Sequence, residues 1–305
     1  MVLSEARQRV RELGWEPPTA ELEPVEACNL CGGSAFTTVT HADRYGFPLS
    51  SAACTTCGLV FLDPRPTAVA YDAFYRDAYR PLVSAFHDRT IDAVSVEEDQ
   101  AGYAAELVRL LEPYLAGRGG GTILDVGGST GVVAEALAAA TGFAGTVLDP
   151  APAELERAAA RGLDTATGTI ESFEAGGERY DVVLLCQTLD HVVDAAGAVA
   201  KLRRVLADDG ILFVDVVDFR AAYLRAWDVE AATKVDHPYA FTEDTAEALL
   251  ARAGLEVARK AYARDRLHVG YVCRLGEPRD VLPSKPSVRD LIREIRYVQN
   301  APAPR

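Results

Sequence analysis

From residue 122 onward, short runs of Val, Ile and Leu alternate with longer segments in which apolar residues recur at helical spacing. The runs predict strands at 122–127, 145–150, 165–170, 180–188 and 211–218. The segments between them predict helices at 131–140, 153–162 and 195–210. Strands that are apolar on both faces and separated by helices are typical of a parallel sheet covered on both sides. The pattern therefore predicts a doubly wound, Rossmann-like α/β domain over 119–275.

Two further strand patterns follow this alternation. Residues 241–254 predict a helix with Thr242 as its N-cap. Residues 255–264 and 268–275 then predict a pair of edge strands, antiparallel to the others or to each other. The tail, 276–305, is rich in proline and contains one amphipathic helix at 287–298.

The segment 63–118 predicts a helical linker, with helices at 68–82 and 100–115. In the first helix four aromatic residues fall on one face, namely Tyr71, Phe74, Tyr75 and Tyr79. Packing onto the next domain explains such a stripe by default. A helix in this position can also roof an active site, so Tyr75 is a candidate catalytic residue and Tyr79 a candidate cofactor contact.

Four cysteines dominate the first 62 residues, where a short polar helix precedes two C-x-x-C-G turns. Cys28 and Cys31 form the first pair, and Cys54 and Cys57 the second. Two such pairs supply the closed, tetrahedral thiolate set of structural Zn²⁺, so residues 1–62 predict a zinc ribbon. A rubredoxin-like iron centre and two disulfides are the alternatives, and His41 is a surface residue by default.

Composition narrows the class of protein. The chain is 49% apolar and 25% charged, as expected for a globular protein with a sizeable core. A formal net charge of −14 disfavours a nucleic-acid partner. No apolar stretch is long enough for a membrane span and no signal peptide is recognisable, so we expect a cytoplasmic protein without a membrane partner.

A glycine-rich turn, "LDVGGSTG" at 124–131, follows the first predicted strand. Against the dinucleotide pattern G-x-G-x-x-G, Gly127 opens the turn, but Ser129 stands at the second glycine position and Val132 at the third. Asp149 ends the second strand, where a carboxylate can accept hydrogen bonds from ribose hydroxyls, and Glu171 follows the third strand. The turn therefore favours an adenosine derivative that lacks a pyrophosphate.

These motifs resemble the class I S-adenosylmethionine-dependent methyltransferases over 122–275, on "ILDVGGSTG", "TVLDP", "GTIESF", "YDVVLLCQTLDHVVD" and "LRRVLADDGILFVDV". With "CNLCG" and "CTTCGLVFLDPRPT" ahead of "FYRDAY", the chain is similar to bacterial zinc-ribbon methyltransferases of sugar, polysaccharide and secondary-metabolite pathways. The resemblance implies a seven-stranded methyltransferase sheet and S-adenosylmethionine as the cofactor. The residues that it implies around the cofactor are Asp125, Gly127, Gly128, Ser129, Gly131, Asp149, Pro150, Glu171, Gln187 and Thr188.

Two histidines are candidates for the catalytic base of an in-line methyl transfer. His191 follows the fourth strand, and His237 lies in the connection after the fifth. A near-neutral imidazole suits proton removal, although a structural role is the alternative for each. Tyr75, Tyr79 and Tyr239 are weaker candidates, with packing in the core as the default explanation.

The sequence leaves three functions open. The first is methyl transfer to a small-molecule acceptor, either a nucleotide-linked sugar or a secondary-metabolite intermediate. The second is a zinc-containing ribosomal RNA methyltransferase, and the third is a catalytically degenerate domain that serves as a binding module. The acceptor atom, the role of the ribbon and the formation of a homodimer are left open.

Overall fold

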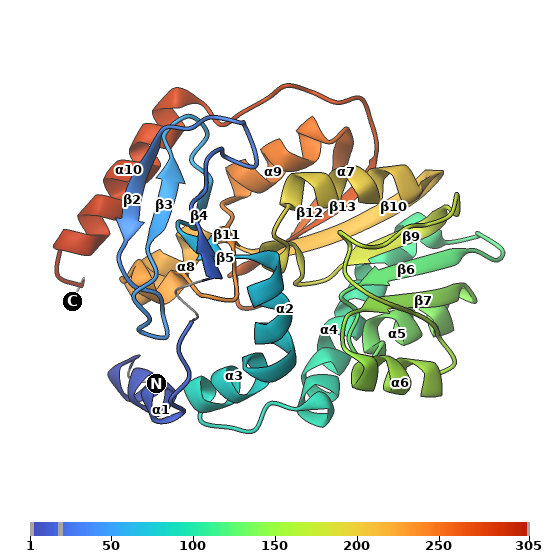
Figure 1. The fold of residues 1–305 in the computed structure, drawn as a ribbon. Coiled ribbons are helices and arrows are strands. Elements are labelled where there is room, and N and C mark those ends of the chain that lie inside the picture. The colour runs from blue at the N-terminus through green and yellow to red at the C-terminus, as the bar shows by residue number, and fades with distance from the viewer. Residues whose placement is uncertain (1–2, 18–20, 304–305) are drawn as a thin grey trace.

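The computed structural model describes residues 3–17 and 21–303 and contains a seven-stranded sheet (Figure 1). Its order is β12-β13-β10-β9-β6-β7-β8. The parallel strands are β6 (Thr122–Val126), β7 (Ala144–Asp149), β8 (Asp164–Thr167), β9 (Tyr180–Leu185) and β10 (Leu206–Val217). The antiparallel edge strands are β12 (Leu255–Tyr262) and β13 (His268–Leu275). The predicted Rossmann-like sheet and its antiparallel edge pair are confirmed.

The order of the strands reverses at β6. The chain passes from β6 to β7 and β8 on one side and then returns to β9 on the other side. Such a switch point leaves a crevice at the carboxyl ends of the strands, where ligands of doubly wound sheets bind.

Helices cover both faces of this sheet. In the view of Figure 1, α7 (Ala195–Val205) and α9 (Glu243–Arg252) lie above it, and α4 (Ala93–Leu115), α5 (Val132–Thr141) and α6 (Pro152–Ala160) lie below it. Thr242 caps α9 as predicted. The helix predicted to reach residue 210 is wrong, because Leu206 already pairs with Tyr180 of β9 and begins β10.

The helices α2 (Ala68–Asp77) and α3 (Tyr79–His87) and the first turns of α4 form a cover over the crevice, here called the roof. A single helix over 68–82 was the expectation, and it is wrong because the helix breaks at Ala78. Pro81 has no N–H to donate to the carbonyl of Asp77, and its ring opposes continuation of α2. The N-terminal helix α1 (Leu3–Glu12) packs beneath α3 through Ala6 and Val10.

The cysteine-containing segment forms a four-stranded sheet of order β11-β4-β3-β2. Its strands are β2 (Phe36–Thr40), β3 (Ser51–Cys54), β4 (Val60–Leu62) and β11 (Tyr239–Ala240). A further two-stranded ladder joins β1 (Leu22–Glu23) and β5 (Arg65–Pro66). Since β11 comes from the connection after β10, the ribbon is hydrogen-bonded into the rest of the molecule.

The C-terminal helix α10 (Lys285–Asn300) packs on the ribbon (Figure 1). Its Ile295 and Val298 are buried in one cluster with Val39 of β2 and Val60 of β4. The remaining elements are α8 (Phe219–Ala226) and the 3₁₀ turns η2 (Leu189–His191) and η3 (Glu230–Ala232). No helix in the described part of the chain is long and apolar enough to cross a bilayer.

Candidate active site

A cavity of about 830 Å³ lies between the roof and the carboxyl ends of β6, β7 and β9. Many of the predicted site residues line it: Tyr75, Tyr79, Gly127, Ser129, Asp149, Pro150, Glu171, Gln187, Thr188, His191 and His237. Asp125, Gly128 and Gly131 lie outside the lining, and so does Tyr239. The cavity has two ends, a glycine-loop end formed by residues 126–151 and a histidine end around His191 and His237.

The loop of residues 127–131 is tightly built. Gly127 has φ +69°, and a Cβ on it would lie 2.7 Å from the side chain of Thr188. Gly131, with φ +79°, caps α5, and a Cβ there would lie 2.6 Å from Leu163. A Cβ on Gly128 would lie 2.7 Å from the carboxyl group of Asp125. These glycines allow the main chain of the loop to approach the neighbouring side chains closely, and Gly127 does so at the wall of the cavity.

Asp149 closes the glycine-loop end. Its Oδ2 accepts from the Ser129 N–H at 3.0 Å, and its Oδ1 accepts from the Ala151 N–H at 2.9 Å. Burial raises its pKa above the usual range of a carboxyl group. Each oxygen keeps a lone pair, so this carboxylate can still accept hydrogen bonds from a ligand in the cavity.

Asp125 lies beneath the loop. It is 1% exposed, and neither carboxyl oxygen has a hydrogen-bond partner among the described residues. Burial, followed by the charge of Asp149, raises its pKa to about 7. The loop thus rests on a carboxyl group that holds its proton near neutral pH.

Gln187 and Thr188 border the cavity after β9, and their contact with the cofactor stays a prediction. Gln187 has φ +50°, and its N–H donates to Asp215 Oδ1 at 2.6 Å, which fixes the turn. Glu171 lies exposed at the rim, where its main-chain carbonyl accepts from Lys201.

His191 and Tyr75 meet at the histidine end, although the chain separates them widely. The Tyr75 hydroxyl donates to the main-chain carbonyl of Asp236 at 2.8 Å and lies 2.7 Å from His191 Nδ1. Because the single hydroxyl proton goes to the carbonyl, Nδ1–H of His191 must donate to the tyrosine oxygen. His191 Nε2 then carries a lone pair, and burial lowers the pKa of this imidazole.

His237 lies beside it, with the two ring centroids 4.4 Å apart. Its Nδ1 is 3.3 Å from Asp190 Oδ2, and its Nε2 is 3.1 Å from Nζ of Lys234. Both ring nitrogens are therefore engaged. Burial, together with the charge of Lys234, holds the pKa of His237 well below its usual range.

Sequence reasoning missed Lys234, Asp190 and Asp236. Burial lowers the pKa of Lys234, whereas the charge of Asp236 opposes this. Asp190 and Asp236 are 3% and 2% exposed. Their proximity to the predicted histidines in "LDH" and "KVDH" was the one available signal, since adjacent residues occupy the same loops. Tyr239 packs in the core, and its hydroxyl donates to the Val193 carbonyl, so the default explanation for this residue holds.

The four ribbon cysteines converge away from this cavity. Cys28 and Cys57 have their sulfurs 3.5 Å apart, and those of Cys31 and Cys54 are 3.6 Å apart. These distances exceed a disulfide bond of about 2.05 Å, and all four thiols are free. All four sulfurs lie within 4.8 Å of one another, so the set fits one tetrahedral metal ion. His41 is exposed and is not part of this cluster.

Three features together are typical of doubly wound α/β domains that bind a nucleoside cofactor. They are the sheet with its switch point, the glycine loop that has no room for a Cβ at Gly127, and the carboxylate at the end of the second strand. Residues 96–260 match the family model described as "Methyltransferase domain". Because the match covers more than half of the chain, the protein belongs to this family of methyltransferase domains.

Curated relatives carry related names. A ubiquinone biosynthesis O-methyltransferase of Methylobacterium sp. (strain 4-46) is 34% identical over 103 residues, which is 32% of this chain and 41% of the relative. Its namesake from Serratia proteamaculans (strain 568) is 32% identical over 125 residues, 37% of this chain and 50% of the relative. The chain thus spans half or less of these relatives.

Among solved structures, a chain of the complex between the Haloferax volcanii Trm112 methyltransferase activator and a methyltransferase is similar in fold. The TM-score is 0.50 at 14% identity, and the match covers 68% of this chain and 98% of that chain. This similarity supports the fold alone.

Proposed function

We propose that the protein transfers the methyl group of S-adenosylmethionine to a hydroxyl oxygen of a small-molecule acceptor, with His191 as the base. One observation carries the proposal: a single cavity joins the glycine loop to two histidines whose pKa values are lowered by burial. The names of the curated relatives support an oxygen acceptor.

The glycine loop and Asp149 are suited to the cofactor. Asp149 lines the cavity, and each of its carboxylate oxygens keeps a lone pair that can accept from the ribose hydroxyls of a nucleoside. When bound, the cofactor supplies an electrophilic methyl group on a sulfonium. The loop would hold the cofactor at its own end of the cavity, and the roof would cover it there.

His191 is the better base of the two histidines, because its Nε2 is the ring nitrogen without a described partner. Lowering of its pKa by burial keeps it neutral at physiological pH, and so ready to take a proton from a hydroxyl. Tyr75 fixes the ring orientation through Nδ1.

His237 and Lys234 serve a second role in this proposal. Asp190 holds His237 at Nδ1, and His237 in turn holds the ammonium of Lys234 at the cavity wall. A cation at this position stabilises the oxyanion that forms as His191 removes the proton.

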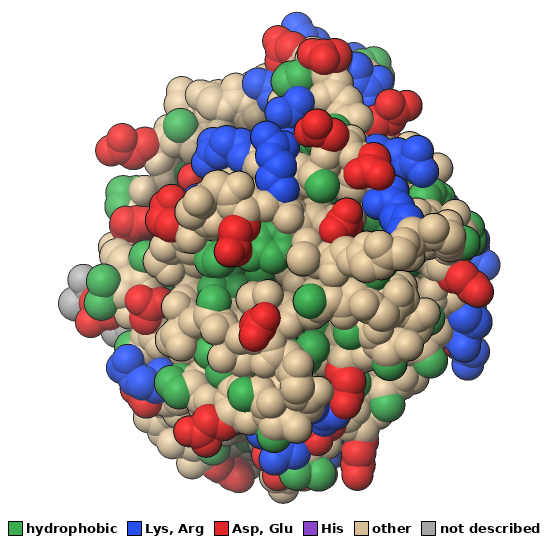
Figure 2. Space-filling view, turned by 90° about the vertical axis from the view of Figure 1, so that its right-hand side faces the viewer, with side chains coloured by type: hydrophobic (Ala, Val, Ile, Leu, Met, Phe, Trp, Pro, Cys, Tyr) green, Lys and Arg blue, Asp and Glu red, His purple; other side chains and the backbone are tan. Residues whose placement is uncertain are grey.

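A small acceptor suits the charge of the surface. The formal net charge is −14, and on the face drawn in Figure 2 Lys and Arg side chains are interspersed with Asp and Glu side chains. Such a surface disfavours a phosphate backbone. The acceptor from a sugar or secondary-metabolite pathway that the sequence implies stays a prediction.

We also propose that Cys28, Cys31, Cys54 and Cys57 hold a structural Zn²⁺. Four thiolates leave no open coordination position for catalysis. Metal analysis of the purified protein tests this directly: about one zinc per chain is expected, and a chain with Cys54→Ser and Cys57→Ser should retain none. Iron in place of zinc would contradict the proposal.

The function is tested by incubating the protein with methyl-labelled S-adenosylmethionine and either a pool of phenolic and sugar metabolites or total RNA. Label in the small-molecule pool supports the proposal, and mass spectrometry of the product identifies the acceptor atom. Label in RNA would overturn it in favour of the ribosomal RNA alternative. Asp149→Ala should abolish labelling, with Asp164→Ala, an exposed aspartate of the neighbouring β8, as the matched control.

A further inference from the structure

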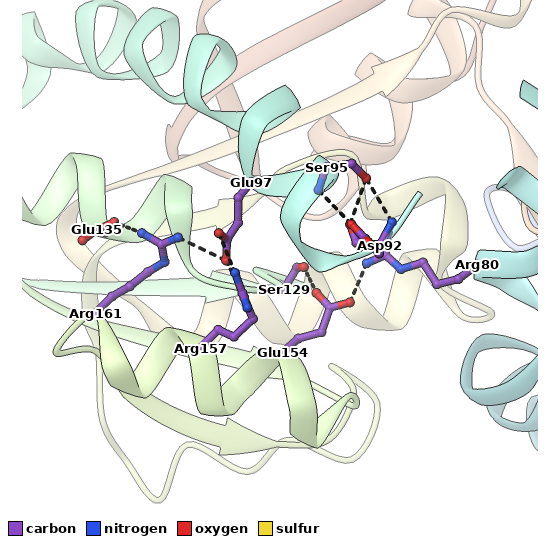
Figure 3. Close-up of polar contacts among 9 residues, drawn as sticks. All are labelled: Arg80, Asp92, Ser95, Glu97, Ser129, Glu135, Glu154, Arg157 and Arg161. Carbon is purple, nitrogen blue, oxygen red and sulfur yellow. Dashed lines mark hydrogen bonds and ion pairs between the residues drawn. The ribbon is translucent and has the colours of Figure 1, made fainter. Parts of the chain in front are cut away.

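One carboxylate connects the glycine loop to the roof. The Ser129 hydroxyl donates to Glu154 Oε2, and Nη2 of Arg80 lies 2.5 Å from Glu154 Oε1 (Figure 3). Glu154 lies in the first turn of α6, and its side chain is 14% exposed. Because both carboxylate oxygens are used, the loop after β6 and helix α3 are fixed to the same group.

The residue at position 129 is informative, because its backbone would suit glycine. Ser129 has φ +53°, in the left-handed region that side chains disfavour. Its N–H donates to Asp149, which any residue at this position could do. Only the hydroxyl contact with Glu154 requires a serine. The serine that replaces the second glycine of the pattern therefore provides a hydrogen bond to Glu154 that glycine could not make.

Arg80 has a second connection, through its own helix. It follows Tyr79, whose ring centroid lies 5.3 Å from that of Tyr75, and Tyr75 holds His191. The roof thus contacts the glycine loop through Arg80 and the histidine end through Tyr75.

We propose that Arg80 and Glu154 are positioning residues that couple cofactor binding to closure of the roof. When the roof is closed, Arg80 holds Glu154, and Glu154 holds Ser129 so that its N–H points at Asp149. The same closure sets Tyr75 against His191. The proposal depends on the cofactor and is independent of the acceptor.

The chain offers a matched control, because a second ion-pair cluster also joins the roof to α6. Glu97 of α4 accepts from Arg157 at 2.6 Å and lies 3.2 Å from Arg161 (Figure 3). This cluster reaches α6 from α4 instead of α3, also includes Glu135 of α5, and has no contact with residues 127–131 among its described hydrogen bonds and ion pairs.

The test is the affinity for S-adenosylhomocysteine, measured by calorimetry with the full chain. Arg80→Gln should weaken binding about tenfold, within the usual range of coupling between sites. Ser129→Gly should weaken it comparably, and the double variant should bind no more weakly than either single one. Arg80→Lys should recover part of the affinity, and Arg157→Gln should stay within about twofold of wild type.

Thermal unfolding of each variant separates positioning from a merely structural role. If the role were only structural, Arg80→Gln and Arg157→Gln would lower the unfolding temperature alike. The effects of substitutions at positions 80 and 129 on the affinity for S-adenosylhomocysteine would then be additive. Unchanged affinity in Arg80→Gln, or additive effects of the two substitutions, would overturn the proposal. If Arg80→Gln fails to fold, Glu154→Gln replaces it in the test, because its side chain can still accept from Ser129 but lacks the charge that holds Arg80. Unchanged affinity for S-adenosylhomocysteine in Glu154→Gln would then overturn the proposal. A wild-type chain that does not bind the probe would instead contradict the cofactor itself.

Discussion

The glycine-loop end of the cavity is formed mainly by the main chain of one short segment. The histidine end is formed by side chains from segments that are distant in sequence. Residues 127–131 are consecutive, and Gly127 and Gly131 among them have positive φ angles and no room for a Cβ atom. At the histidine end, Tyr75 of α2, His191 of η2 and His237 of a later loop come together only in the folded chain.

This difference makes the two ends sensitive to different changes. A loop that depends on close approach tolerates no added atom, so a single methyl group should abolish its function. A network of side chains loses function gradually, according to which hydrogen bond is removed. Substitutions at the two ends should therefore separate binding of the cofactor from the chemical step.

The largest effect is expected for Gly127→Ala. The added Cβ would lie 2.7 Å from Thr188 at a φ of +69°, so the loop must shift away from its position. We expect affinity for S-adenosylhomocysteine to fall at least about a hundredfold, measured by calorimetry. Gly142→Ala is the control, since Gly142 has φ +75° but nothing within 4 Å of its Cβ position. Equal effects of the two substitutions would show that backbone strain, and not the clash, governs the loop.

His191→Gln should have the next largest effect and act on the other step. Removal of a general base lowers kcat by about a hundredfold or more, and affinity for S-adenosylhomocysteine should stay within about twofold. The measurement is the steady-state rate with the acceptor that the labelling experiment identifies. His87→Gln is the control, because His87 also lines the cavity. If His237→Gln abolished the rate while His191→Gln did not, the base would be His237.

The glycine-loop end was easier to predict from the sequence than the histidine end, because it is one consecutive segment whereas the histidine end combines distant side chains. The glycine loop and Asp149 were recognisable, because each lies at a fixed distance from an apolar strand. The side chains of Asp190, Lys234 and Asp236 were not singled out, because charged residues in loops are common and nothing in the chain indicates which of them become buried. The pairing of Tyr75 with His191 was not predicted either, because 116 residues separate them in the chain.

The sheet itself was predictable, whereas its connection to the ribbon was not. The alternation of apolar runs and helices predicted the five parallel strands, and two further apolar runs predicted the edge pair, but β11 has only two residues. Tyr239 and Ala240 add to β4 of the ribbon because Phe61 and Val60 present a free edge, which is a property of the folded ribbon.

Tyr75→Phe should have a smaller effect than the loss of His191. It removes the hydroxyl that accepts from His191 Nδ1 and donates to the Asp236 carbonyl, so the imidazole loses its orienting partner but remains present. We expect kcat to fall about tenfold, as for loss of one hydrogen bond to a catalytic group. Tyr71→Phe is a close control, because its hydroxyl donates to the neighbouring Val235 carbonyl but does not contact His191. If kcat fell by a comparable amount in both variants, the cause would be a change in the loop of residues 235–236 and not the loss of the contact with His191.

The last prediction concerns stability instead of binding or rate, and it examines the glycine-loop end without any ligand. The pKa of Asp125 is about 7 in the folded chain because of burial, compared with an ordinary value near 3.9 in the unfolded chain. Between these values the unfolded state has released its proton while the folded state keeps it, so this residue destabilises the protein progressively as pH rises from about 4 to 7. Asp125→Asn, which mimics the protonated form, should therefore gain stability over wild type as pH rises through this range and show little difference near pH 4. Denaturant unfolding at several pH values measures this, with Asp164→Asn, exposed at the start of β8, as the control. A difference that grows toward low pH instead would mean that Asp125 is ionised in the folded chain, and that the loop rests on a charge.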